Sequence, residues 1–243
     1  SGCDAVKFQS YKAEELVVKD SPAYWDISKE STPSQYELFK KFDKFGYAEY
    51  EELHNYCSKN NIQFSSTPFD YEAVDYLEPW IGFYKISSSD LSNMPLVKYI
   101  AKKKKPVFLS TGASTIDEIE MAVNVIRKEA SNEICLMHCV LDYPTRNKDA
   151  NLSVLKTLKT RFPHCLLGYS DHTMPDERML ILTVACLYGA RVIEKHFTLD
   201  KKLQGNDHYH AAEPEDFVKF RKNIELIQDI NGNRLFDPYL ITD

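Results

Sequence analysis

The feature that most constrains the fold is a regular alternation of short apolar segments with amphipathic ones. Seven apolar segments have the length and composition of strands: Ala5–Ser10, Ile62–Thr67, Phe83–Ser89, Pro106–Gly112, Ile134–Val140, Cys165–Asp171 and Arg191–Thr198. Helical patterns lie between and after them: Tyr47–Lys59, Glu72–Leu77, Pro95–Lys104, Ile116–Glu129, Leu152–Phe162, Asp176–Tyr188 and Pro214–Ile230. Strand–helix alternation predicts an α/β fold with a parallel sheet, and apolar strands indicate that helices cover it.

The length of the repeat distinguishes two parallel architectures. A doubly wound sheet also fits, but a repeat of about 25–35 residues favours a TIM-type (β/α)8 barrel. Residues 1–243 are expected to form this barrel as a single domain. Seven strands leave it one short, and residues 1–4 lead directly into the first of them. We therefore expect the chain to lack the first βα unit of the barrel. The polar segment Lys19–Thr32 is expected to be a long loop over one end.

Composition excludes several functional classes. The net charge of −6 argues against nucleic acid or an anionic membrane as the main partner. No apolar run approaches the ~18 residues of a spanning helix, and no signal peptide opens the chain. None of the six cysteines forms a CxxC pair, which favours buried thiols in a reducing compartment over disulfides or zinc. A cytoplasmic enzyme or binding protein is expected.

Polar residues gather at the carboxyl ends of the predicted strands. In chain order they are Lys7, Gln9, Ser65, Ser66, Thr67, Lys85, Ser87, Ser88, Ser89, Asp90, Ser110, Thr111, His138, Ser170, Asp171, His172, Glu194, Lys195 and His196. A hydrophobic core needs none of these groups, and burying an isolated lysine is costly. Barrel enzymes carry their chemistry at this end of the strands. We therefore expect these residues to line a single polar site at the carboxyl end of the barrel.

The two lysines predict an anion site. Lys7 and Lys85 each lie between apolar residues, so each points to the opposite face from its neighbours. If that face is the inside of the barrel, two ammonium groups meet several hydroxyls, which suits a small dianion such as a phosphate ester bearing a carboxylate. The alternative is that each lysine points outward and reaches solvent.

The histidines predict a metal site. His172 and His196 follow consecutive strands, so their imidazoles can converge on one divalent ion, with water, substrate or a carboxylate completing the coordination. His138 on the preceding strand is a third candidate. His208 and His210, in the loop after the last strand, either face the substrate or are solvated; the sequence leaves both open.

Eight stretches in this order resemble the sialic acid synthases, which condense phosphoenolpyruvate with an N-acyl sugar. They are AVKFQ (Ala5–Gln9), FSSTPFD (Phe64–Asp70), YKISS (Tyr84–Ser88), LSTG (Leu109–Gly112), HC (138–139), YP (143–144), GYSDHT (Gly168–Thr173) and VIEKHFT (Val192–Thr198). Together they span almost the whole chain. The family includes N-acetylneuraminate, legionaminate and pseudaminate synthases.

The resemblance implies roles for individual residues. It implies that the phosphate and carboxylate of phosphoenolpyruvate are held by Lys7, Thr67, Lys85, Ser88, Ser110 and Ser170. It implies a divalent metal, most often Mn2+, bound by His172 and His196. It implies a sugar site near Gln9, Tyr143 and Asp207. Asp90 stands where members often carry a glutamate, so we expect it to be catalytic together with Lys85, His172 and His196.

The resemblance also carries expectations for the whole protein. It implies a homodimer whose C-terminal antifreeze-like domain gives an arginine to the partner's site, and a first strand that supplies a glutamate. We expect this chain to lack both parts. The predicted reaction is metal-dependent condensation of phosphoenolpyruvate with an N-acyl hexosamine such as N-acetylmannosamine, with release of phosphate. The alternatives are another phosphoenolpyruvate aldol synthase that acts on a sugar phosphate, and a non-catalytic binder of sugar or phosphoenolpyruvate.

Overall fold

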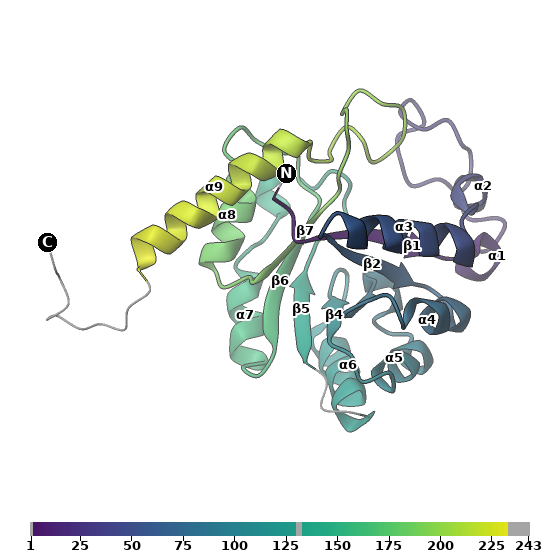
Figure 1. Cartoon of the computed structure of the whole chain (residues 1–243), viewed down its shortest axis with the longest axis horizontal. Coiled ribbons are helices and arrows are strands. Elements are labelled where there is room, and N and C mark those ends of the chain that lie inside the picture. Colours follow the sequence, from purple (N-terminus) through teal and green to yellow (C-terminus); the bar gives the residue numbers. More distant parts are fainter. Residues whose placement is uncertain (1, 130–132, 233–243) are drawn as a thin grey trace, which may run out of the picture.

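The structure is a computed structural model that describes residues 2–129 and 133–232 (Figure 1). Its strands are β1 (Ala5–Ser10), β2 (Gln63–Pro68), β3 (Tyr84–Ile86), β4 (Val107–Ser110), β5 (Ile134–His138), β6 (Leu166–Asp171) and β7 (Val192–Lys195). Its helices are α1 (Ala13–Leu16), α2 (Gln35–Phe42), α3 (Tyr47–Lys59), α4 (Tyr71–Leu77), α5 (Met94–Ala101), α6 (Ile116–Glu129), α7 (Val154–Arg161), α8 (Leu180–Leu187) and α9 (Pro214–Asn231). Two 3-10 turns, η1 (Ser88–Asp90) and η2 (Asn147–Asp149), complete the elements.

The strands form a curled parallel half-barrel. β1 pairs with β2, and β3 to β7 form a five-stranded parallel sheet in sequence order. β2 lies against β3, so the two sheets follow one another around the curve, with helices on the outer side (Figure 1). In the described ranges, β1 and β7 each pair with one strand only. The predicted parallel α/β architecture is therefore confirmed, but these strands do not close an eight-stranded barrel.

The apolar core lies between the strands and the outer helices. Ile86, Leu109 and Leu136 are in register on β3, β4 and β5 and are almost completely buried. They belong to one cluster with Ile100 of α5 and Ile126 of α6. Each such side chain contributes roughly 1.5–3 kcal/mol when removed from water. Because strand side chains alternate, the residues between them point to the concave side of the sheet.

Local capping explains where two of the covering helices begin. Thr115 and Glu118 form a reciprocal cap of α6: the Thr115 N–H donates to Glu118 Oε2 at 2.7 Å, and the Glu118 N–H donates to Thr115 Oγ1 at 3.3 Å. Asp70 accepts from the Ala73 N–H at 2.7 Å and begins α4. Both α3 and α6 have the predicted bounds.

Three local predictions were wrong. The third strand ends at Ile86, and Ser88 and Asp90 lie in η1 instead of on the strand. The helix predicted from Asp176 begins only at Leu180, because Met179 adopts a left-handed conformation (φ 49°) that cannot continue a helix. α1 and α2 were not predicted, although Ser34 caps α2 by accepting from the Glu37 N–H. The predicted loop at Lys19–Thr32 is irregular, as expected.

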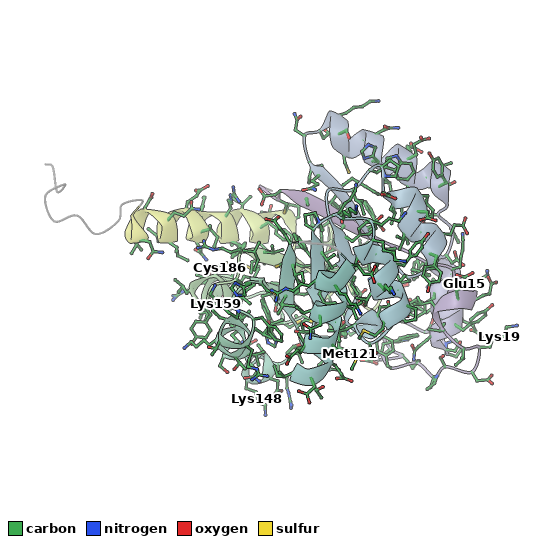
Figure 2. The ribbon with its side chains drawn as sticks, turned by 90° about the horizontal axis from the view of Figure 1, so that it is seen from below. Glu15, Lys19, Met121, Lys148, Lys159 and Cys186 are labelled. Atoms are coloured by element: carbon green, nitrogen blue, oxygen red, sulfur yellow. The ribbon has the colours of Figure 1, made fainter. Side chains whose placement is uncertain are left out.

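The last helix lies only partly on the body of the protein. α9 contacts α8, and its C-terminal part extends away from the strands in both views (Figures 1 and 2). Leu226 and Ile230 are correspondingly exposed. Across the ranges that the structure describes, no helix combines the length and apolarity needed to cross a bilayer.

Candidate active site

Alternation along the strands sends two lysines to the concave side of the half-barrel. Lys85 lies between Tyr84 and Ile86, which are buried under the helices, so its side chain points the other way. Both lysines reach Glu194 on β7: Lys85 Nζ lies 3.2 Å from Oε1, and Lys7 Nζ lies 4.0 Å from Oε2. Two ammonium groups and one carboxylate therefore share the inner face.

Hydroxyl groups surround these lysines. Lys7 Nζ donates to Thr67 Oγ1 at 3.4 Å, and Ser170 Oγ donates to Glu194 Oε1 at 2.8 Å. The buried hydroxyls of Ser65 and Ser110, on the same face, have no hydrogen-bond partner in the described part of the chain. Unpartnered buried hydroxyls are costly, and an anion with several oxygens can satisfy them. The name anion cradle refers here to Lys7, Ser65, Thr67, Lys85, Ser110 and Ser170.

The charges in the anion cradle are strongly coupled. Burial is the main cause that holds the pKa of Lys7 below its usual value; Glu194 opposes this shift and Lys85 adds to it. Burial opposes ionisation of Glu194, but Lys7, Lys85 and the Ser170 hydrogen bond outweigh it and hold the pKa of Glu194 well below its usual range. Glu194 is therefore a carboxylate near neutral pH, and it occupies the space between the lysines where an external anion would bind.

The two predicted metal-binding histidines lie beside each other. His172 and His196 follow β6 and β7, and their ring centroids are 5.5 Å apart. His172 Nδ1 lies 2.7 Å from the Val140 carbonyl, which orients the ring and leaves Nε2 as the ligand atom. Burial lowers the pKa of His196 to about 4, against the opposing charge of Asp207, so its imidazole is neutral near neutral pH. Neutral imidazole is the form that binds metals.

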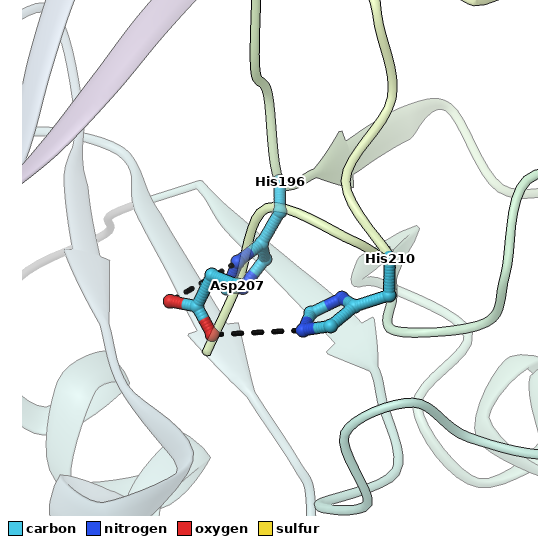
Figure 3. A group of neighbouring side chains, drawn as sticks. All are labelled: His196, Asp207 and His210. Carbon is cyan, nitrogen blue, oxygen red and sulfur yellow. Dashed lines mark ion pairs between the residues drawn. The ribbon is translucent and has the colours of Figure 1, made fainter. Parts of the chain in front are cut away.

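The loop after β7 adds Asp207 and His210 to this end of the sheet, and the segment after β5 adds Tyr143. Asp207 lies between His196 and His210: Oδ2 is 3.5 Å from His196 Nδ1, and Oδ1 is 3.5 Å from His210 Nε2 (Figure 3). The Tyr143 ring is 4.1 Å from that of His172 and 6.1 Å from those of His196 and His210. We call His172, His196 and His210 the histidine cluster. The ligand atoms of His196, Asp207 and His210 all lie within 4.8 Å of one another.

A second lysine–carboxylate pair lies behind the histidine cluster. Lys195 Nζ is 2.7 Å from Asp171 Oδ2, and both side chains are almost fully buried. Asp171 also accepts from the Tyr169 hydroxyl and from the Thr173 N–H and hydroxyl, while Lys195 donates to the Thr173 carbonyl. Asp171 and Lys195 directly precede His172 and His196, so this pair joins the two strand ends that carry the histidines.

Four predicted site residues have weaker links to this centre. Gln9 is exposed at the carboxyl end of β1. Ser88 Oγ accepts from the Gly112 N–H at 2.9 Å and contacts Cys139 Sγ at 3.1 Å. Asp90 accepts from Asn93 and Ser89, and burial raises its pKa against these hydrogen bonds. His138 Nε2 bonds to the Ala150 carbonyl and its ring stacks on Tyr169, so the structure favours a structural role for it.

Two residues gained importance only in the structure. Glu194 stood in the sequence among the strand-end polar residues, but its position between both lysines depends on the curvature that brings β7 opposite β1 and β3. His210 was one of two loop histidines, and nothing in the sequence separated it from His208. In the structure His210 is completely buried, whereas His208 bonds to Thr198 Oγ1.

Taken together, these features define a class of protein. Parallel α/β half-barrels with lysines, hydroxyls and histidines at the carboxyl ends of the strands are typical of barrel enzymes that act on anionic substrates. The chain belongs to the NeuB family, which its residues 1–235 match. Synthases of this family use phosphoenolpyruvate and are transferase-class enzymes, and they depend on a metal.

Individual relatives agree with this assignment. An uncharacterized protein of Methanocaldococcus jannaschii is 42% identical over 233 residues, covering 96% of this chain and 64% of that protein. The N,N'-diacetyllegionaminic acid synthase of Campylobacter jejuni is 39% identical over 239 residues, covering 96% of this chain and 70% of that enzyme. The chain thus spans about two thirds of the length of these relatives.

Solved structures support the fold. The N-acetylneuraminic acid synthetase of Leptospira borgpetersenii, in complex with citrate, superposes with a TM-score of 0.84 at 36% identity, covering 97% of this chain and 76% of that one. A truncated 3-deoxy-D-arabino-heptulosonate 7-phosphate synthase of Thermotoga maritima gives 0.66 at 18% identity over 77% of this chain and 74% of that one. At that identity the second likeness concerns the fold alone.

Proposed function

We propose that the chain carries the substrate- and metal-binding half-barrel of a synthase that condenses phosphoenolpyruvate with an N-acyl hexosamine and releases phosphate. The observation that carries this proposal is the convergence of Lys7 and Lys85 on one inner face, beside a cluster of histidines. Legionaminic acid synthases and N-acetylneuraminate-9-phosphate synthases among the relatives support the substrate class.

The anion cradle would hold phosphoenolpyruvate. Its carboxylate and phosphate together match two ammonium groups, and the free hydroxyls of Ser65 and Ser110 can donate to their oxygens. Ser88 and Thr67 extend the set of donors along the strand ends. Binding requires Glu194 to give up contacts with at least one lysine, because its carboxylate now pairs with both.

The histidine cluster fits a divalent ion. His172 presents a free Nε2, and His196 is neutral near neutral pH, so both can act as ligands. Bound there, the ion, most often Mn2+ in this family by resemblance, would act as a Lewis acid toward the aldehyde oxygen of the open-chain sugar. Gln9 and Tyr143 lie at the same end of the sheet and would orient the sugar, and Asp207 lies beside them between His196 and His210.

The chain's own residues would then position the reacting atoms. The double bond of phosphoenolpyruvate supplies the electron pair that joins its enol carbon to the aldehyde carbon, and the aldehyde oxygen gains a proton and becomes a hydroxyl. Water adds to the neighbouring carbon and gives up a proton. The carbon–oxygen bond to phosphate then breaks, and loss of the remaining hydroxyl proton leaves a ketone. Lys85 and Lys7 hold the charged groups in place while this happens. Asp90, whose pKa is raised by burial, is the candidate to take the proton from the attacking water.

The decisive experiment measures phosphate release from phosphoenolpyruvate. A panel of free and phosphorylated N-acyl hexosamines would be tested with Mn2+ and after chelation, on this chain and on any longer form of it. Metal-dependent release with one sugar supports the proposal, and release only with phosphorylated sugars favours the sugar-phosphate alternative. Thermal stabilisation by phosphoenolpyruvate or sugar without any release would identify a non-catalytic binding protein instead.

The proposed function also carries a proposal for the compartment and the oligomeric state. We propose a cytoplasmic homodimer. Cys57, Cys135, Cys139 and Cys165 are buried free thiols, as suits a reducing compartment. The dimer is carried over from the resemblance to the sialic acid synthases, and size-exclusion chromatography with light scattering would test it.

A further inference from the structure

We propose that His210 is a third protein ligand of the divalent ion, which it binds together with His196 and Asp207. This inference rests on the metal requirement of the proposed function. It gives a role to a histidine in the loop after β7, which is not among the polar residues at the strand ends. This set of two imidazoles and one carboxylate is joined at His196 to His172, the other histidine that the proposed function assigns to the ion.

The distances fit one ion. Each carboxylate oxygen of Asp207 faces a different imidazole at 3.5 Å, and the three candidate ligand atoms lie within 4.8 Å of one another (Figure 3). Ligands that are about 2.1 Å from the same ion lie about 3.0–3.5 Å apart at octahedral or tetrahedral angles. Nitrogen–oxygen hydrogen bonds are shorter, at about 2.7–3.2 Å. The two nitrogen–oxygen separations of 3.5 Å lie at the upper end of the range for two ligands of one ion and are longer than an ordinary hydrogen bond.

Burial gives a second, independent argument. His210 is completely buried, and neither ring nitrogen makes a hydrogen bond to any other residue described in the structure. Leaving a buried polar nitrogen without a partner costs about 1–3 kcal/mol. Its Nε2 faces Asp207, so an ion between the two satisfies it. The neighbouring His208 is different, because its Nδ1 bonds to Thr198 Oγ1 at 2.7 Å.

The chemistry of the set indicates the class of ion. Two imidazoles and one carboxylate suit Mn2+, Fe2+, Co2+ or Zn2+ better than Mg2+ or Ca2+, which prefer oxygen ligands. Asp207 is 58% exposed and His196 is 30% exposed. The ion would therefore keep open positions for water or a substrate oxygen, as catalytic metal sites do.

The test is Mn2+ binding, measured by electron paramagnetic resonance on the full chain. The variants are His210→Ala, His210→Gln, which keeps more of the side-chain volume, and His208→Ala as the matched control in the same loop. We expect both His210 variants to lower Mn2+ affinity at least about tenfold, and His208→Ala to leave it unchanged. Spin-echo modulation of the bound Mn2+ should count one imidazole nitrogen fewer in the His210 variants.

The outcomes separate this inference from the proposed function, because phosphate release is measured in parallel. Parental Mn2+ affinity in His210→Gln, or no Mn2+ binding by the parent, would overturn the inference. If phosphate release nevertheless depends on Mn2+, the proposed function stands without it. Conversely, Mn2+ binding that depends on His210, without phosphate release for any sugar, would support His210 as a metal ligand and contradict the proposed synthase function. Thermal unfolding without metal shows whether each variant is folded.

Discussion

Two lysine–carboxylate networks meet on β7, and they differ in how completely they are satisfied. Lys195 and Asp171 form a sealed pair, in which hydrogen bonds from Tyr169 and Thr173 satisfy the carboxylate. Glu194, one residue earlier, pairs with two lysines in the open anion cradle, where neighbouring hydroxyls remain unpartnered. The sealed network has no capacity left for a ligand, whereas the open one has an excess of positive charge. This difference is what separates a structural pair from a binding site.

The largest effect should come from breaking the sealed pair. Asp171→Asn leaves the ammonium group of Lys195 buried without a counter-charge, which costs about 3–5 kcal/mol. Urea denaturation in the absence of metal measures the loss in the free energy of unfolding.

The matched control is Lys103→Met, which removes a partly exposed lysine that lies 2.8 Å from Asp75 and 2.6 Å from Glu78. That variant should lose only about 0–1 kcal/mol. Adding Lys195→Met to Asp171→Asn should recover part of the loss, because no charge then remains buried. Equal losses in Asp171→Asn and Lys103→Met would remove the distinction between the two networks.

A smaller effect is expected in the open network. Lys85→Met removes a charged donor to phosphoenolpyruvate, worth about 1.5–3 kcal/mol, so affinity for phosphoenolpyruvate should fall by roughly ten- to a hundredfold. Isothermal titration measures this change, and kinetics with the active sugar should show its KM almost unaltered. Lys103→Met serves again as the control and should bind as the parent does. Parallel losses for both substrates would argue against a phosphate-binding lysine.

The smallest effect concerns Glu194. Glu194→Gln removes the carboxylate that competes with an external anion for both lysines, so inorganic phosphate should bind more tightly. The gain should be about three- to tenfold, as expected for a unit charge about 4 Å away that water screens, an interaction worth about 1 kcal/mol. Titration calorimetry with phosphate provides the measurement. Unchanged or weaker binding would mean that Glu194 holds the lysines in place and does not compete with the ligand.

Much of the fold could be predicted because it depends on local patterns. The apolar segments predicted where the strands lie, although the third strand ends earlier than predicted. Side-chain alternation also predicted that Lys85 faces away from Ile86, and the structure shows that this face is the concave one. These inferences need only the sequence neighbours of each residue.

The parts that were missed depend on contacts between distant residues. Nothing near Glu194 in the sequence indicates that curvature brings it to Lys7 and Lys85. His210 and His208 are equivalent in the sequence, and only the path of the loop buries one of them. Asp90 was assigned to a strand end, but it lies in η1. A 3-10 turn is too short to leave a periodic pattern in the sequence, so the sequence did not predict it.

The order Glu194–Lys195–His196 has a consequence for how this segment can change. Glu194 and His196 face the concave side of the sheet, and Lys195 between them faces the buried side under the helices. The role of each residue therefore depends on which face of the strand it occupies. Deleting a single residue from β7 would move the ammonium group into the cavity and drive the carboxylate into the apolar layer. Insertions and deletions in this strand should therefore be tolerated less well than most substitutions. Only the insertion or deletion of two residues would return each side chain to its original face of the sheet.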